Sequence, residues 1–125
     1  MRLLLDTHVL IWWLEGGDRL TPDLIERLEA RDTSTAVSAA TVWEIEIKRA
    51  LGKLDAPDDL LDQVTASGFA QLPISAAHAV AAGRLPRHHD DPFDRMLIAQ
   101  ALAEQRTIVT RDRRFEQYGV ATAAA

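Results

Sequence analysis

Short apolar runs alternate with helix-like segments along this chain, and several of the runs end beside an acidic residue. The run at 3–5 leads directly into Asp6, and the run at 108–109 is followed after two residues by Asp112. A regular alternation of strands and helices is typical of βαβ units, which build a mainly parallel sheet. In such a sheet the strand-to-helix junctions lie at one edge, where ligands bind. We therefore expect an α/β fold whose acidic residues meet in one pocket.

The pattern predicts a single domain over residues 1–125, with an Ala-rich tail that frays after about Val120. Strands are expected at 2–5, 35–38, 69–73 and 107–110, with a last strand near Val120. Helices are expected at 7–14, after Thr21-Pro22, and at 41–51, 57–65, 75–82, 92–105 and 113–117. The glycines at 16, 17, 52 and 83 are expected to end the helices that precede them.

Composition excludes several classes of function. The chain has no cysteine, so disulfides, thiolate zinc sites and cysteine nucleophiles are absent, as suits a cytoplasmic protein. No apolar stretch approaches the roughly 20 residues of a membrane span. The net charge of −5 argues against a general nucleic-acid binder. However, every Lys or Arg after residue 62 is an arginine between Arg84 and Arg114. These arginines form either a rim that holds phosphates or a plain solvated surface.

Four acids, Asp6, Glu44, Asp94 and Asp112, are the candidate site residues, and helix capping is the simpler explanation for each one alone. Thr41 and Glu44 have the spacing of a capping box. Asp91 before Pro92 has the pattern of an N-cap followed by proline at the first helical position. We assign Asp91 to that role, beside the site.

Two arguments favour a shared site over independent caps. Helical spacing places Asp94 above Leu97 and Ile98, and Glu44 above Ile47, at the ends of apolar stripes. Buried carboxylates are costly unless they are paired or bind a cation, and hard divalent ions prefer oxygen ligands. All four acids also fall at the ends that should converge. The pattern therefore predicts a metal-dependent enzyme.

Several other residues lie close to these acids in sequence. Thr110 ends a strand two residues before Asp112, so its hydroxyl either joins the pocket or is simply the polar end of the strand. His88 and His89 lie in a predicted loop and are either metal ligands or exposed loop histidines, which are the commoner case. Lys48 is either a surface residue or a contact for phosphate or a partner. Of the adjacent tryptophans at 12 and 13, one should look outward and favour a protein interface, with Trp43 a further large apolar residue.

The chain resembles the PIN-domain family, and within it the VapC-type toxins of prokaryotic toxin–antitoxin pairs. The similarity runs from Leu3 to about Val120, with its motifs in family order. The segments that carry it are Leu4-Leu5-Asp6-Thr7-His8, Ser38-Ala39-Ala40-Thr41-Val42-Trp43-Glu44-Ile45, Asp91-Pro92-Phe93-Asp94-Arg95-Met96-Leu97-Ile98-Ala99-Gln100-Ala101 and Val109-Thr110-Arg111-Asp112.

The resemblance implies a three-layer α/β/α sandwich and an endoribonuclease that depends on Mg²⁺ or Mn²⁺. It also implies a homodimer and a small VapB-type antitoxin whose tail occupies the active-site groove, with higher assembly in the complex. The family's acidic quartet maps onto Asp6, Glu44, Asp94 and Asp112, which would be catalytic and would hold the metal. Its polar strand-end residue maps onto Thr110. Arg95 and Arg111 are expected phosphate contacts.

The expected reaction is hydrolysis of RNA with one or two metals, in which a metal-bound water attacks phosphorus. The products would carry a 5′-phosphate and a 3′-hydroxyl. Phosphoryl transfer through an aspartyl phosphate at Asp6 is the rival enzyme, but His8 stands where haloacid-dehalogenase-like phosphatases need a second aspartate. The non-enzymatic alternative is a PIN-fold module that only holds a partner. Such a module would predict a broken quartet.

Overall fold

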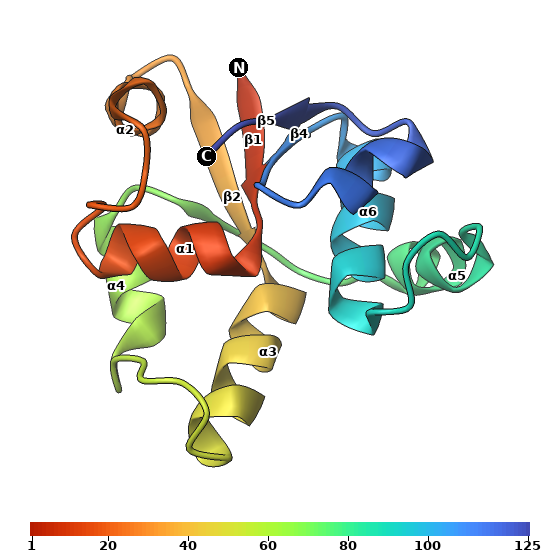
Figure 1. Ribbon diagram of the computed structural model, residues 1–125, viewed down its shortest axis with the longest axis horizontal. Helices are drawn as coiled ribbons and strands as arrows, with labels where there is room; N and C mark the ends of the chain where they lie inside the picture. The colour runs from red at the N-terminus through yellow and green to blue at the C-terminus, as the bar shows by residue number, and fades with distance from the viewer.

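One fully parallel sheet organises the chain. The computed structural model describes all residues 1–125 (Figure 1). Its five strands have the order β3-β2-β1-β4-β5. They are β1 (Arg2–Leu5), β2 (Ser34–Ser38), β3 (Ala70–Leu72), β4 (Thr107–Val109) and β5 (Thr122–Ala123), and each adjacent pair is parallel. The predicted α/β class is confirmed, and β1, the first strand in the sequence, is the central one.

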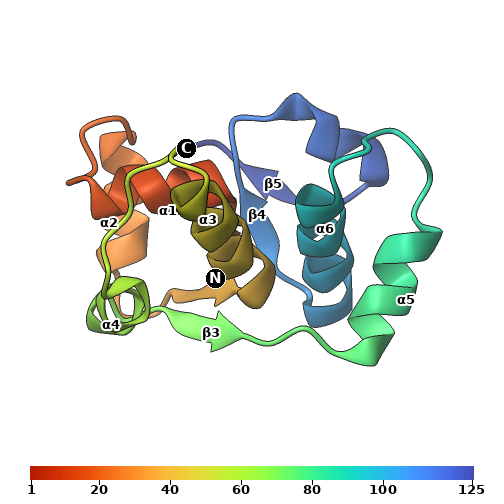
Figure 2. The same cartoon turned by 90° about the horizontal axis from the view of Figure 1, so that it is seen from below.

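Helices cover both faces of the sheet and make the three expected layers (Figure 2). The helices are α1 (Thr7–Leu14), α2 (Pro22–Glu29), α3 (Ala39–Ala50), α4 (Leu60–Ala66), α5 (Ala76–Arg84), α6 (Pro92–Glu104) and the 3-10 helix η1 (Arg113–Tyr118). Because strand side chains alternate, Leu3 and Leu5 pack in a core with α1 to α4, whereas Leu4 packs with α6 and η1. None of the helices is long and apolar enough to cross a membrane.

Several predicted helix boundaries are wrong, including the start of α4, which lies at Leu60 rather than at residue 57. Helix α3 begins at Ala39, because Ser38 is its N-cap and its Oγ accepts a hydrogen bond from the Ala40 N–H at 3.0 Å. Thr41 therefore lies inside the helix, and the capping box with Glu44 does not exist. Gly83 does not end α5, which continues to Arg84.

The C-terminal tail forms a short last strand, β5, in the region near Val120 where one was expected. Strand β5 extends the sheet, since the Ile108 N–H donates to the Ala121 carbonyl at 2.9 Å and the Thr110 N–H donates to the Ala123 carbonyl at 3.0 Å. Ala125 is buried, and the Arg111 guanidinium donates to its carbonyl at 3.1 Å. The tail is held by backbone pairing and by this arginine rather than by its small side chains.

A buried hydrogen-bond bridge joins the two halves of the molecule. Ser38 Oγ donates to Gln100 Oε1 at 2.5 Å, and Gln100 Nε2 donates to the Pro73 carbonyl at 3.2 Å. Ser38 and Gln100 are both fully buried. The bridge therefore connects the start of α3 to the middle of α6 across the sheet edge.

We expect Ser38→Ala to lower the free energy of unfolding by about 2–3 kcal/mol, because it removes a helix cap and leaves Gln100 Oε1 without a donor. Urea unfolding followed by circular dichroism measures the loss. The control is Ser75→Ala, which removes only the exposed cap of α5 and should cost about 1 kcal/mol. Equal losses in both variants would contradict the role of the bridge.

Candidate metal centre

The four predicted acids lie in one pocket at the carboxyl edge of the sheet. Asp6 follows β1, Glu44 lies on α3, Asp94 is in the first turn of α6, and Asp112 precedes η1. All four line a single pocket of about 380 Å³. The other residues at its wall include His8, Trp12, Lys48, Asp91, Arg111 and Arg114. The strand-to-helix logic thus brings together residues that are up to 106 positions apart in the sequence.

Asp6 is held rigidly by two donors. The His8 backbone N–H donates to Oδ1 at 2.7 Å, so Asp6 is also the N-cap of α1. The Thr110 hydroxyl donates to Oδ2 at 2.6 Å. Thr110 therefore contacts a carboxylate of the pocket, although it does not itself line the pocket. The side chain of His8 also contacts Asp6, and this hydrogen bond raises the pKa of the His8 imidazole.

Glu44 is buried beneath Lys48. Its Oε1 accepts a hydrogen bond from the Thr7 hydroxyl at 2.7 Å, and its Oε2 pairs with Lys48 Nζ at 2.9 Å. Residues four apart share one face of a helix, so Lys48 lies directly over Glu44. This hydrogen bond raises the pKa of Lys48. Lys48 therefore lines the pocket.

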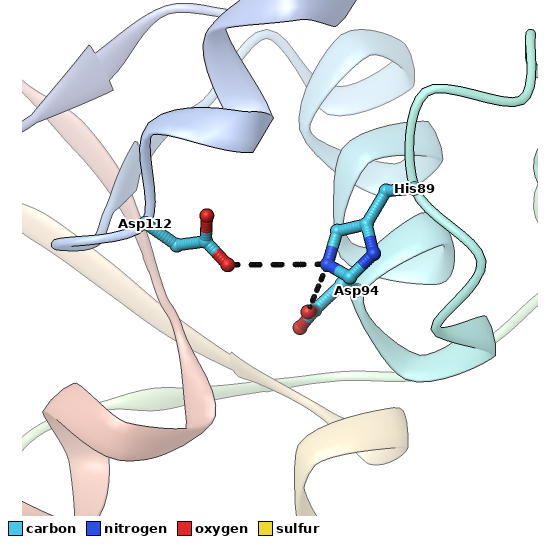
Figure 3. A group of neighbouring side chains, drawn as sticks. All are labelled: His89, Asp94 and Asp112. Atoms are coloured by element: carbon cyan, nitrogen blue, oxygen red, sulfur yellow. Dashed lines mark hydrogen bonds and ion pairs between the residues drawn. The ribbon is translucent and has the colours of Figure 1, made fainter.

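The carboxyl of Asp94 has a pKa above its ordinary value. Burial, with the charges of Asp91 and Asp6, raises its pKa to about 6, even though a hydrogen bond from His89 acts in the opposite direction. His89 Nε2 lies 2.7 Å from Asp94 Oδ2 (Figure 3). The expectation of an exposed His89 is wrong, because the side chain is buried, whereas His88 is exposed. Asp91 is the N-cap of α6, as predicted.

Asp112 forms an ion pair with Arg114. One of its oxygens accepts from the Arg114 backbone N–H at 2.9 Å, which caps η1, and the guanidinium of Arg114 bonds both carboxylate oxygens at 2.7–3.1 Å. The hydrogen bond from the Arg114 side chain is the main cause that lowers the pKa of Asp112. The sequence placed Arg114 among the arginines of a possible phosphate rim, but its pairing with Asp112 was not predicted. Its spacing of two residues from a predicted cap would have been the signal.

The two predicted phosphate contacts differ. The guanidinium of Arg95 donates to the carbonyls of Ala82, Leu85, Pro86 and His89 at 2.9–3.2 Å. Arg95 therefore organises the loop before α6, and the expectation that it binds phosphate is wrong. Arg111 lines the pocket, where its guanidinium stacks 4.3 Å from the centre of the Trp12 ring. Its phosphate contact stays a prediction.

The tryptophans also differ from expectation. Trp12 and Trp13 point to different surroundings, but both are half-buried, and Trp13 Nε1 donates to Ser67 Oγ at 2.9 Å. The exposed one is Trp43, with 61% of its surface accessible and its ring edge-on to Phe93. The candidate interface patch is therefore centred on α3 rather than on α1.

The donor set fits a hard divalent cation. The pocket offers carboxylate oxygens on four different elements and no thiolate, which is the chemistry that Mg²⁺ and Mn²⁺ select. Ligand atoms of His89, Asp94 and Asp112 lie within 4.8 Å of one another. The raised pKa of Asp94 means that the cluster resists full ionisation without added positive charge. A divalent cation would relieve this repulsion.

Comparison with known proteins gives a consistent result. The PIN domain family model matches residues 3–121. Ribonuclease VapC22 of Mycobacterium tuberculosis is 32% identical, over 93% of this chain and 91% of that protein. Among solved structures, VapBC2 from Rickettsia felis superposes with a TM-score of 0.75 at 17% identity, covering 100% of this chain and 99% of that one. VapBC from Salmonella typhimurium gives 0.75 at 21% identity, covering 99% and 98%. At these identities the two superpositions establish the fold.

Proposed function

The chain belongs to the PIN-domain family, and on this premise we propose that it is a metal-dependent endoribonuclease, the toxin of a VapBC-type toxin–antitoxin pair. The observation that carries the proposal is the convergence of Asp6, Glu44, Asp94 and Asp112 in one pocket. A relative at 32% identity is named a ribonuclease, which supports RNA as the substrate. A module that only held a partner would have no need of an intact quartet.

Asp6 and Asp94 would bind the Mg²⁺ or Mn²⁺ directly, and Glu44 and Asp112 would do so directly or through water. A divalent cation in such a site lowers the pKa of water and offsets charge on the phosphate. Hydrogen bonds within the chain orient two of these carboxylates. Thr110 holds Asp6 Oδ2, and Thr7 holds Glu44 Oε1, so the carboxylates are oriented before any cation arrives.

The cationic side chains at the rim would receive the RNA backbone. Lys48, Arg111 and Arg114 all line the pocket. They would attract phosphate to an otherwise acidic cavity and hold it beside the carboxylates. With water as the nucleophile and the 3′-oxygen as the leaving group, each cut would leave a 5′-phosphate and a 3′-hydroxyl.

The product ends test this chemistry. Purified chain, freed of antitoxin, is incubated with total RNA and Mn²⁺, and the fragments are examined for their termini. We expect 5′-phosphate ends that ligate directly to an adaptor. Fragments that end in a 2′,3′-cyclic phosphate would contradict hydrolysis by water, because such ends form when the ribose 2′-hydroxyl attacks phosphorus.

We also propose a homodimer that is bound by a VapB-type antitoxin and acts in the cytoplasm. The support is twofold. Two structural neighbours, from Rickettsia felis and Salmonella typhimurium, are described as VapBC bound to DNA. In addition, Trp43 lies beside an apolar groove of about 560 Å³ formed with Val42, Leu61 and Leu72, a surface of the kind that protein partners cover. Light scattering of the isolated chain should give twice the mass of 13.9 kDa.

Thr110→Val should lower cleavage by about 10- to 100-fold, because valine keeps the shape of threonine but cannot donate to Asp6 Oδ2. Thr110→Ser keeps the hydroxyl and should restore most of the rate. Both variants are compared in the same Mn²⁺-dependent assay. If the valine variant is as active as the serine variant, Thr110 is only the polar end of a strand.

A further inference from the structure

His89 is a buried histidine for which the proposed reaction has no stated use. Only 7% of its surface is exposed, and its ring lies edge-on to Phe115. Nε2 is 2.7 Å from Asp94 Oδ2 and 3.9 Å from Asp112 Oδ2, so the ring stands between two members of the quartet (Figure 3). The backbone at this position is held as well, because the His89 carbonyl accepts hydrogen bonds from Arg95 at 3.2 Å and from the Tyr118 hydroxyl at 3.3 Å.

The other ring nitrogen decides what His89 can do. Nδ1 accepts a hydrogen bond from the Asp91 backbone N–H at 3.3 Å. A nitrogen that accepts an N–H carries no proton, so the ring N–H is on Nε2. That proton points to Asp94 Oδ2. The N-cap residue of α6 thus selects the tautomer of the histidine that faces the first turn of the same helix.

Two roles are compatible with this position. Nε2 lies close enough to the carboxylates of Asp94 and Asp112 for all three residues to share a cation. However, a protonated nitrogen cannot ligate a metal, and Mg²⁺ or Mn²⁺ already has oxygen ligands here. The second role is to orient Asp94. Its Oδ2 is occupied by His89, whereas no protein donor contacts its Oδ1.

We infer that His89 is a positioning residue, which donates from Nε2 to Asp94 Oδ2 and so presents Oδ1 to the cation. This inference rests on the proposed function, because it assigns Asp94 as a metal ligand. The arrangement is that of an outer partner of a metal ligand, whose loss typically costs about 10- to 100-fold in metal affinity or activity.

Two amide substitutions separate the two hydrogen bonds of the ring. The side-chain nitrogen of glutamine reaches the place of Nε2, so His89→Gln keeps the donor to Asp94 and loses the acceptor for Asp91. The oxygen of asparagine reaches the place of Nδ1, so His89→Asn keeps the contact with Asp91 and loses the donor. His88→Asn and His88→Gln are matched controls, since that neighbouring ring is exposed and packs only against Tyr118.

The test measures Mn²⁺ affinity by calorimetry, together with kcat and KM for RNA cleavage. We expect His89→Gln to stay within about threefold of the unmodified chain, and His89→Asn to lose about 10- to 100-fold in Mn²⁺ affinity or kcat at an unchanged KM. A purely structural histidine would give the opposite order, because asparagine restores the contact with α6. Nitrogen-15 spectra of the unmodified metal-free chain should show His89 protonated at Nε2.

Three results would overturn the inference. One is an asparagine variant that equals the unmodified chain in Mn²⁺ affinity and kcat. Another is an Nδ1-protonated ring. The third is a nitrogen coupling to bound Mn²⁺ in pulsed electron paramagnetic resonance that disappears in His89→Gln, since it would make His89 a direct ligand. Failure of the unmodified chain to cut RNA would instead count against the proposed function, and the Mn²⁺ affinities would still decide the role of His89.

Discussion

Asp94→Asn should reduce RNA cleavage by about a thousandfold, which corresponds to the loss of about 4 kcal/mol of transition-state stabilisation. The substitution keeps the size of the side chain, and the amide oxygen can still accept the hydrogen bond from His89. It removes the negative charge that a cation would bind. Single-turnover cleavage with excess protein measures the loss. A variant that retained a tenth of the rate would show that Asp94 is not a principal ligand.

The same substitution should make the metal-free protein more stable at pH 8. The pKa of Asp94 is about 6 in the folded chain, above its ordinary value of 3.8. A carboxyl with a raised folded pKa contributes stability that is fully present below pH 4 and is lost as the pH rises through 6. Above pH 6 the ionised group therefore lowers stability by on the order of 3 kcal/mol, a cost that the uncharged asparagine does not carry. Urea unfolding in EDTA should show this gain at pH 8 and none at pH 4.

Asp112→Asn is the matched control, because it should change stability at pH 8 in the opposite direction to Asp94→Asn. Arg114 lowers the pKa of Asp112. The ionised carboxylate therefore stabilises the fold at any pH above the pKa that Asp112 has in the unfolded chain. Its replacement should lower stability at pH 8. If both variants were destabilised at pH 8, the raised pKa of Asp94 would be wrong as an account of the pocket.

Mn²⁺ should raise the unfolding temperature of the unmodified chain by about 10 °C at pH 8. A ligand that binds only the folded state at a hundred times its Kd adds about 2.7 kcal/mol, which produces a shift of this size in a chain of this length. The cation needs an ionised Asp94, so protons compete with it as the pH falls through about 6. Thermal melts with and without Mn²⁺ should therefore show a much smaller shift at pH 5. An equal shift in Asp94→Asn would place the cation elsewhere.

Sequence reasoning predicted those features that depend on local pattern. The apolar run of β1 and the capping aspartate after it are consecutive, and residues 3–5 are indeed fully buried at the centre of the sheet. The convergence of the quartet followed from the parallel connection of strands, which places every junction at one edge. The family resemblance then supplied the roles expected of these acids and of Thr110.

Contacts between distant residues account for what the sequence did not predict. Ser38 and Thr41 are equally good caps locally, and Ser38 is the one used, with its hydroxyl also bonded to Gln100, 62 residues away. His89 is buried because its loop is anchored by Arg95 and Tyr118, from two other elements. The tail after Val120 pairs with β4 and bonds to Arg111. These contacts join residues that are far apart in the sequence, so the local sequence pattern could not predict them.

The most direct test is cleavage of RNA by the purified, antitoxin-free chain with Mn²⁺, beside an EDTA control and the Asp94→Asn variant. Discrete fragments that disappear in both controls are the predicted result, and they would establish a metal-dependent nuclease at the acidic pocket. Cleavage that survives EDTA, or that the variant performs as well as the unmodified chain, would contradict the central claim.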